Sequence, residues 1–417
     1  MKNRTFLLIS CIVSMSMFWN ACSDWVEEVN PVIDQVSDDD VNTESQANFL
    51  RLGVEVRFAT AHDQIVLLSE ALGDAFFFDF KIPGAINTDL ADIESGTILL
   101  TNNQVEAMFE DVGELRFLAD DLISRVNNRI TWTDQEEKRK TLFVANLYAG
   151  IARFFFATYI GLTETQGGGV IDAGPFIPAN EMYAQALASL QAALDNVPGS
   201  YTYGAVTGDS SYWSRVINSI IARIHLYQGE TSQAQQFAQN GMQQGDAPFQ
   251  SLHSSQSQNI LFVLAGTGAP QFALPERFNE YVLADPAEKA RIPFVDVTGQ
   301  GQLFHIQTKY SRQDDPIDFM SWQENELMLA ELELASNAAS ALARVNAVRA
   351  SHGIGDLVPA SGTLSEDELR QEIDKELLLT GRRLPDQRRW GIFHLPAGSW
   401  QYLPITASER NSNPNLN

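Results

Sequence analysis

The chain has 417 residues, with 28 lysines and arginines against 53 aspartates and glutamates, and a formal net charge of −25. A surface this acidic repels nucleic acid, so nucleic acid is excluded as an expected partner. The only two cysteines, Cys11 and Cys22, lie near the start, so the rest of the chain can hold neither a disulfide nor a cysteine metal site.

The first 21 residues predict an export signal. Lys2 and Arg4 form a short positive start, and the apolar run from residue 6 to residue 18 is too short for a mature membrane anchor. The segment "FWNAC" then resembles the lipobox of bacterial lipoproteins, in which the cysteine is acylated, although Trp19 and Asn20 depart from the usual pattern.

We therefore expect Cys22 to be lipidated and to anchor the chain to a bilayer, because two or three acyl chains suffice for stable attachment. The alternative is a secreted protein in which Cys22 is incidental. Residues 22–46 are polar and acidic and are expected to form a tether. The aspartates at 38–40 lack the spacing and glycine of a calcium loop, so a solvated helix start is the better interpretation.

Helical periodicity dominates the body, which we expect to span 47–417. Apolar residues at spacings of three and four predict helices at 46–72, 102–130 and 133–162, the last with Thr133 and Glu136 as a cap. Between the first two helices, residues 73–96 are rich in glycine, aspartate and aromatic residues, which is typical of a loop with adhesive side chains.

Further helices come in pairs. Residues 141–196, 215–243 and 321–353 each resemble a tetratricopeptide helix pair, in which small residues let antiparallel helices approach closely; Gly229 is the expected hinge of the second pair. Insertions at about 164–181 and 246–320 interrupt any strict period. The second insertion lacks a helical period, and short strands are expected there at 259–266 and 302–310.

The C-terminal region begins with a capping box, Ser365 and Glu368, and its helix is expected to end at Gly381 in a left-handed cap. The four arginines of "RRLPDQRRWGIF" follow. They could grip an anionic ligand, or Arg383, Arg388 and Arg389 could pair with Asp386, Glu376 and helix-end carbonyls. The interleaved acids favour the structural role.

This block is similar to the C-terminal block of the RagB/SusD-like nutrient-binding lipoproteins. The matching residues are Glu372, Glu376, Leu377, Gly381, Arg383, Asp386, Arg389 and Trp390. The ending "YLPITASERNSNPNLN" and the segment 337–354 also resemble that family, whereas Ile373, Thr380 and Gln387 depart from its pattern. The resemblance implies a mainly α, SusD-like fold with tetratricopeptide-like helix pairs as scaffold and a loop-rich ligand region containing little β-structure.

The resemblance also implies a function. Such a protein is a non-enzymatic lipoprotein of the outer membrane, facing the cell exterior, that delivers a glycan or other oligomeric nutrient to a SusC-like TonB-dependent channel. It needs no cofactor. The residues expected to contact ligand are Phe77, Phe78, Asn87, Asp89, Phe278, Tyr281, Tyr310 and Trp322. For each of them, ordinary core packing is the alternative.

Two other functions stay open. A helical glycoside hydrolase would need two carboxylates about 5 to 10 Å apart in a cleft. With 53 acids some pair could always be chosen, so the sequence gives no support for an enzyme. The six histidines form no HExxH motif or close pair, and no metal site is expected. The other possibility is a surface lipoprotein that has no ligand.

Overall fold

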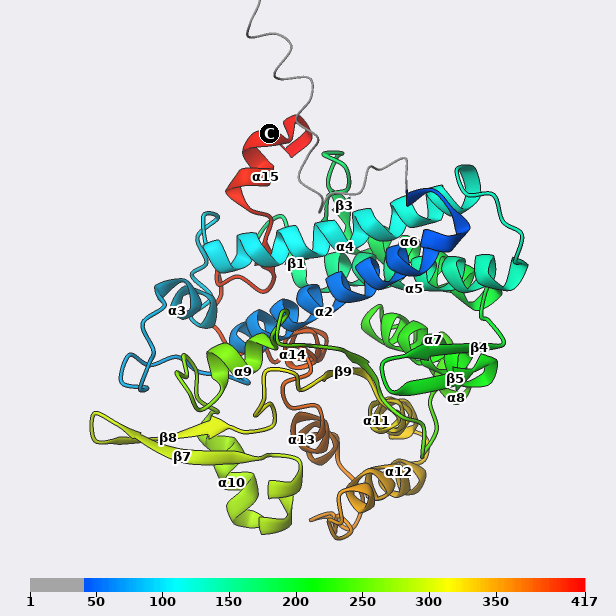
Figure 1. Cartoon of the computed structure of the whole chain (residues 1–417). Coiled ribbons are helices and arrows are strands. Elements are labelled where there is room, and N and C mark those ends of the chain that lie inside the picture. The colour runs from blue at the N-terminus through cyan, green and yellow to red at the C-terminus, as the bar shows by residue number, and fades with distance from the viewer. Residues whose placement is uncertain (1–40, 417) are drawn as a thin grey trace, which may run out of the picture.

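The computed structural model describes residues 41–416, so the leader, Cys22 and most of the tether lie outside the described residues. Figure 1 shows a body built mainly from helices. Its first half consists of the long helices α2 (Ala47–Leu72), α4 (Asn103–Asn128), α5 (Gln135–Tyr159) and α6 (Ala179–Asp195). The three predicted helices are thus confirmed, and the loop between the first two also contains the short helix α3 (Thr88–Glu94).

The start of α5 differs from the prediction. Asp134 is the capping residue, and its carboxylate accepts the backbone N–H groups of Glu136 and Glu137. Thr133 instead donates through its backbone N–H and its hydroxyl to Glu44, at the start of the described chain. The Asp134 carboxylate accepts from two N–H groups that have no partner within the helix. Thr133 is therefore not needed as the cap and can contact Glu44 instead.

The three expected helix pairs are present. They are α5 with α6, α7 (Ser210–Tyr227) with α8 (Thr231–Gln239), and α11 (Trp322–Glu333) with α12 (Ala338–Ser351). Gly229 turns the second pair with a φ of +74°, a conformation that favours glycine. The chain then closes with α13 (Glu366–Glu376), α14 (Arg383–Trp390), α15 (Ala407–Ser412) and the 3₁₀ turn η4 (Pro414–Leu416).

The capping box of Ser365 and Glu368 at the start of α13 is confirmed. The predicted end of that helix is wrong, because α13 stops at Glu376, five residues before Gly381. Leu379 takes a positive φ of +57° and breaks the helix earlier. Gly381 itself has a φ of +83° and lies in the connection to α14.

The long insertion is the irregular part of the molecule, and its middle part, residues 276–307, projects to one side (Figure 1). Its elements are β6 (Phe249–Ser251), α9 (Ile260–Ala265), α10 (Glu276–Ala284), η3 (Pro286–Ala290), β7 (Phe294–Gly299), β8 (Gln302–Gln307) and β9 (Ile317–Met320). The strand expected at 302–310 is confirmed over its first six residues. The strand expected at 259–266 is wrong: Asn259 accepts the N–H groups of Leu261 and Phe262 and caps a helix there.

Sheet structure is limited to two-stranded pairs in the described chain. β7 and β8 form an antiparallel hairpin, and β6 pairs antiparallel with β9. The other strands are β1 (Ile160–Gly161) with β10 (Leu403–Pro404), β2 (Gly168–Gly169) with β3 (Ile177–Pro178), and β4 (Ser200–Tyr203) with β5 (Val206–Asp209). The β1–β10 pair is parallel and fixes the C-terminal segment to the end of α5.

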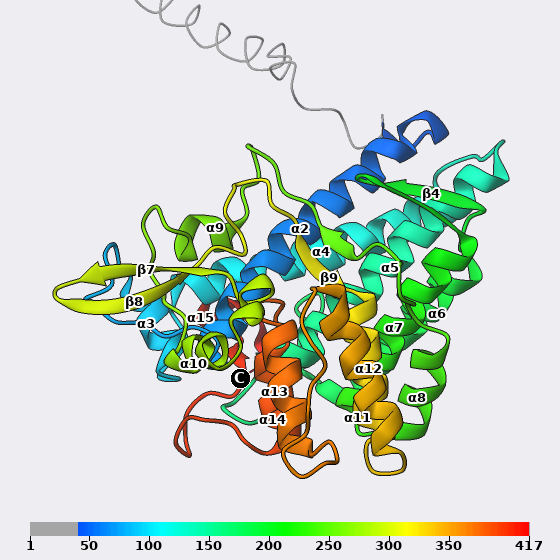
Figure 2. The ribbon, with the colours of Figure 1, turned by 90° about the horizontal axis from the view of Figure 1, so that it is seen from below.

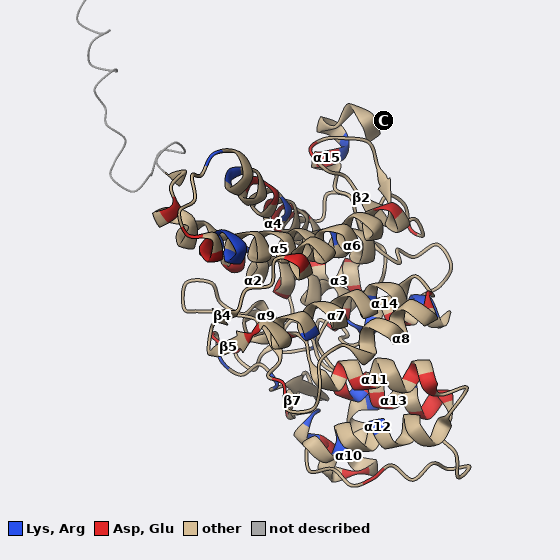
Figure 3. Ribbon diagram, turned by 90° about the vertical axis from the view of Figure 1, so that its right-hand side faces the viewer, with Lys and Arg blue, Asp and Glu red and all other residues tan. Residues whose placement is uncertain are grey.

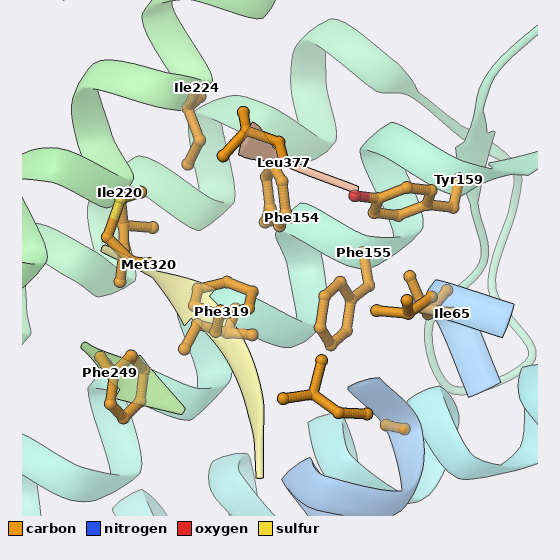
Figure 4. Packing of buried hydrophobic residues seen from close by; sticks show 14 of the residues in the cluster. Ile65, Phe154, Phe155, Tyr159, Ile220, Ile224, Phe249, Phe319, Met320 and Leu377 are labelled. Atoms are coloured by element: carbon orange, nitrogen blue, oxygen red, sulfur yellow. The ribbon is translucent and has the colours of Figure 1, made fainter. Parts of the chain in front are cut away.

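Aromatic packing centres on α5. Phe154 and Phe155 of this helix contact Phe319 of β9, and Phe249 of β6 packs on the same ring, as Figure 4 shows. Within 41–416, α5 is the only helix long and apolar enough to cross a membrane, yet 89% of that stretch is buried inside the protein. It is therefore the central core helix of this fold.

Candidate functional site

The loop after α2 and the long insertion lie side by side. Phe77 and Ala273 exchange two backbone hydrogen bonds, of 2.9 and 3.1 Å, in an isolated antiparallel bridge. A small second core forms beneath this contact from Ile82, Ala85, Ala273, Phe304 and Ile306, with Phe77 and Phe78 packed against it. Two segments almost 200 residues apart in sequence thus form one surface.

The outer side of this surface is aromatic. Phe78 is half-buried and packs edge-on against Phe80 at 5.0 Å, while Phe80 is 59% exposed. Lys81 Nζ lies 3.4 Å from Gln302 Oε1 on the β7–β8 hairpin, where Leu303 is also exposed. We call Phe77, Phe78, Phe80, Lys81 and Gln302 the loop face. Exposed aromatic rings beside polar groups are suited to packing against sugar rings.

Asn87 and Asp89 have structural partners. The Asn87 side chain caps α3 by accepting the Asp89 N–H group at 3.0 Å. The Asp89 carboxylate accepts the backbone N–H and the side-chain amide of Asn103 at the start of α4. Both side chains therefore brace the loop, Asn87 through its Oδ1 and Asp89 through its Oδ2.

The predicted contacts in the insertion are mainly core residues. Phe278 is fully buried, and Tyr310 and Trp322 are nearly so. Tyr310 donates its hydroxyl to Leu379 O at 2.9 Å, and Tyr281, which is half-buried, has its hydroxyl 3.4 Å from Asp374 Oδ2. In this structure Phe278, Tyr310 and Trp322 thus follow the core-packing alternative and do not line the loop face.

The C-terminal arginine block is held by acids from several elements. Arg389 forms two bonds with Glu331 of α11, of 2.5 and 2.7 Å, and a third with Asp386. Burial would raise the pKa of Asp386, but Arg382 and Arg389 hold it below its ordinary value. The indole N–H of Trp390 also donates to Glu331 at 3.0 Å.

Two of the expected pairings differ. Arg383 approaches Asp374 at 3.4 Å and Asp74 at 3.8 Å, and it pairs with neither Asp386 nor Glu376. Glu376 instead contacts Arg291 at 3.4 Å and His352 at 3.0 Å. Arg388 does bond to carbonyls, those of Thr158 and Gln401. The partners come from distant segments, which local spacing cannot reveal.

Comparison with solved structures identifies the architecture. SusD superfamily proteins from Bacteroides vulgatus and Bacteroides thetaiotaomicron both match with a TM-score of 0.71, at 14% and 16% identity, over 90% and 89% of this chain and 98% of each of theirs. The chain has the SusD-like fold. No protein-family model and no curated protein matches the sequence.

Two further similar structures are described with a glycan. A laminarin binding SusD-like protein matches with a TM-score of 0.69 at 15% identity, over 89% of this chain and 99% of that one. A structure with xylogluco-oligosaccharide matches with a TM-score of 0.68 at 13% identity, over 89% and 98%. The fold inferred from the C-terminal motifs is thereby confirmed.

One buried arrangement within the SusD-like body has the residue types of a hydrolase. Ser251 Oγ lies 3.4 Å from His253 Nε2, and His253 Nδ1 lies 3.7 Å from Asp63 Oδ2. Burial lowers the pKa of His253 to about 4 and raises that of Asp63 well above its usual range. Ser251 is fully buried, and His62 also bonds to its hydroxyl at 2.9 Å. A nucleophilic serine must contact its substrate, and in this arrangement a substrate cannot reach Ser251.

A cavity on the helical side of the fold is not predicted from the sequence. About 530 Å³ in volume, it is lined by Tyr183, Tyr227, Tyr402 and Arg388, among others. The helical spacing around Tyr183 and Tyr227 predicts only that they pack between helices. The fold brings them to the same cavity as Arg388. Residues 41–416 contain no cluster of three or more histidines, cysteines or acids that could hold a metal ion.

Proposed function

We propose that this protein is a non-enzymatic lipoprotein of the outer membrane that binds a glycan at the loop face and passes it to a SusC-like TonB-dependent channel. The observation that carries the proposal is the joining of the loop after α2 to the long insertion, which presents Phe78 and Phe80 on a SusD-like scaffold. The laminarin and xylogluco-oligosaccharide structures with this fold favour a glycan over other nutrients.

Glycan binding is tested by titrating the full chain, extracted in mild detergent, with laminarin and with xyloglucan oligosaccharides. We expect at least one to bind and the double variant Phe78→Ala/Phe80→Ala to lose most of that affinity, since it removes the aromatic rings on which a sugar would pack. Phe117→Ala is the matched control, because Phe117 on α4 is 56% exposed, like Phe80. Equal loss in the control would contradict a role for the loop face.

Anchoring and delivery are tested separately. The variant Cys22→Ala should no longer incorporate labelled palmitate and should leave the outer-membrane fraction, because the acyl chains supply the attachment. Native purification of the wild type should recover a large TonB-dependent barrel with it. Repeated recovery of the lipoprotein alone at native expression would speak against the delivery role and leave glycan binding intact.

A further inference from the structure

The helical side of the molecule contains a cavity that the loop face does not share. Its walls come from the end of α5, the first turn of α6, the α7–α8 turn and α14. Figure 2 shows α6, α7 and α8 on the opposite side from the β7–β8 hairpin. At about 530 Å³ the cavity lies within the usual range for small-molecule pockets and has room for one or two sugar rings.

The cavity contains a cation that has no acidic partner. Arg388 lies in a protein of net charge −25, yet no carboxylate within the described chain lies within 4.0 Å of its guanidinium. Its bonds go to the carbonyl oxygens of Thr158 and Gln401, which use two of its five N–H groups. The other three N–H groups have no partner in residues 41–416.

The position of Arg388 is fixed by its surroundings. Its guanidinium lies 4.0 Å from the centre of the Tyr402 ring. Tyr402 is in turn held by close packing against Gly161 and Gly167, where an added Cβ would lie within 2.7 Å of its side chain. Arg388 is therefore presented by a rigid wall, and a fixed guanidinium fork binds a carboxylate in a defined orientation.

The remaining walls suit a sugar ring. Tyr183 and Tyr227 line the cavity, and Tyr183 is fixed by a 3.0 Å bond between its hydroxyl and that of Thr158. Asn180 and Gln228 line the cavity with side chains that carry amide groups. Glu230 also lines the cavity; one of its carboxylate oxygens lies 2.6 Å from His225 Nδ1, and the other can accept from a sugar hydroxyl.

We infer that this cavity binds a carboxylated sugar, of the size of one or two uronic acid units, with the carboxylate on Arg388 and the ring against the tyrosines. A neutral sugar would leave Arg388 without an acidic partner, and a bare anion would leave the tyrosine surface unused. The site is separate from the proposed loop face, so it holds or fails independently of the binding proposed there.

Asn180 offers the test, because it is exposed and lies in the first turn of α6. Asn180→Glu places a negative charge where it favours the helix and repels a bound carboxylate, whereas Asn180→Lys does the reverse. In each variant, the affinity for the carboxylate and the stability of the protein should therefore change in opposite directions. A weaker affinity in Asn180→Glu cannot then be explained by loss of the fold. Gln185→Glu, exposed further along α6 and outside the cavity, is the charge-matched control.

The full chain in detergent is titrated with glucuronic acid and with glucose, with ligand NMR for detection and thermal melts on the same samples. We expect the wild type to bind glucuronic acid in preference to glucose. Relative to wild type, the affinity for glucuronic acid should be about tenfold lower in Asn180→Glu and higher in Asn180→Lys. In Gln185→Glu it should stay within about twofold of wild type. Asn180→Glu should melt no lower than wild type.

Three results would overturn the inference. They are equal binding of glucose and glucuronic acid, no binding of glucuronic acid, and loss of its binding in the Phe78→Ala/Phe80→Ala variant with no change in Asn180→Glu. The last would place the acid on the loop face. Loss of laminarin or xyloglucan binding in that double variant, with glucuronic acid binding retained, would support two separate sites.

Discussion

The two halves of the helical scaffold are stabilised by different physical means. The α5–α8 half has a core of aromatic and small side chains, in which Phe154 contacts Phe155, Tyr159, Tyr227 and Phe319. The α11–α14 half is rich in charged residues around α11 and α13, as Figure 3 shows, and several of them, such as Glu324, Glu372 and Arg382, are buried. Apolar packing is non-directional and tolerates substitution, whereas a buried ion network depends on each member.

The charged half also ties the irregular insertion to the C-terminus. Glu288 and Arg291, from η3 and the residue after it, meet Arg349 of α12 and Glu372 and Lys375 of α13 in one buried network. Burial would raise the pKa of Glu288, but Arg291, Lys375 and Arg349 lower it to about 2. A carboxylate held in this way keeps its charge at any physiological pH.

The largest effect is expected from Glu324→Ala in the charged half. Glu324 bonds to Arg223 at 2.6 and 2.7 Å and also to Arg382, and all three side chains are only 3% exposed. The variant would leave two buried guanidinium groups without their shared partner, and we expect a loss of about 3 to 5 kcal/mol in the free energy of unfolding. Urea denaturation measures it.

Glu326→Ala on the same helix is the control for that measurement. Glu326 pairs with Arg344 in a half-exposed position, with the side chains 20% and 26% exposed. Its loss should lower the free energy of unfolding by no more than about 1 kcal/mol. Similar losses in the two variants would show that burial does not distinguish the ion pairs of α11.

The next effect depends on pH and concerns Glu70 of α2. Burial raises its pKa from 4.5 to about 7, although Gly381 N–H donates to its carboxylate at 2.5 Å. The folded protein therefore holds a proton that the unfolded chain loses above pH 4.5. This stabilisation is complete below pH 4.5 and is lost as the pH rises through 7, with a total of about 3 kcal/mol.

Glu70→Gln should remove this dependence and raise the free energy of unfolding at pH 8, because the amide is neutral at every pH. His253 works in the opposite direction: its pKa of about 4 means that stability is lost as the pH falls from 6.5 towards 4. The difference between variant and wild type across pH 5 to 8 isolates Glu70. Parallel curves would contradict a raised pKa.

The sequence predicts features that depend on neighbouring residues better than features that depend on contacts between distant segments. Helices such as α2 and α4 show their apolar face in the spacing of their own residues, and the Ser365 capping box is local. The segment 259–266 has strand-like residues, but Asn259 caps it as a helix. Phe278 and Tyr310 look like ligand contacts until the fold buries them. The partners of Arg383 and Glu376 come from distant segments, so no local pattern could give them.

A smaller effect is expected from Trp390→Ala. The ring lies between Arg370 and Arg389, whose guanidinium carbons are 5.2 and 4.7 Å from its centre, and its N–H donates to Glu331. Because Trp390 is only half-buried, we expect a loss of about 2 to 3 kcal/mol, below the range for a fully buried ring. Thermal and urea unfolding measure it, and an unchanged stability would contradict a structural role for the block.

The smallest effect is expected in the apolar half, from Phe154→Leu. Phe154 is fully buried among rings from α5, α7 and β9, and Figure 4 shows it beside Ile224 and Leu377. Leucine keeps most of the apolar contact, and neighbouring side chains can shift without losing a directional bond, so the loss should be about 1 kcal/mol. Arg223 lies 5.7 Å from the Phe154 ring centre and keeps Glu324 as its partner in this variant. Urea denaturation of Phe154→Leu beside Glu324→Ala therefore compares the two halves directly, and an equal loss in both would mean that the aromatic core depends on exact fit as strictly as the ion network does.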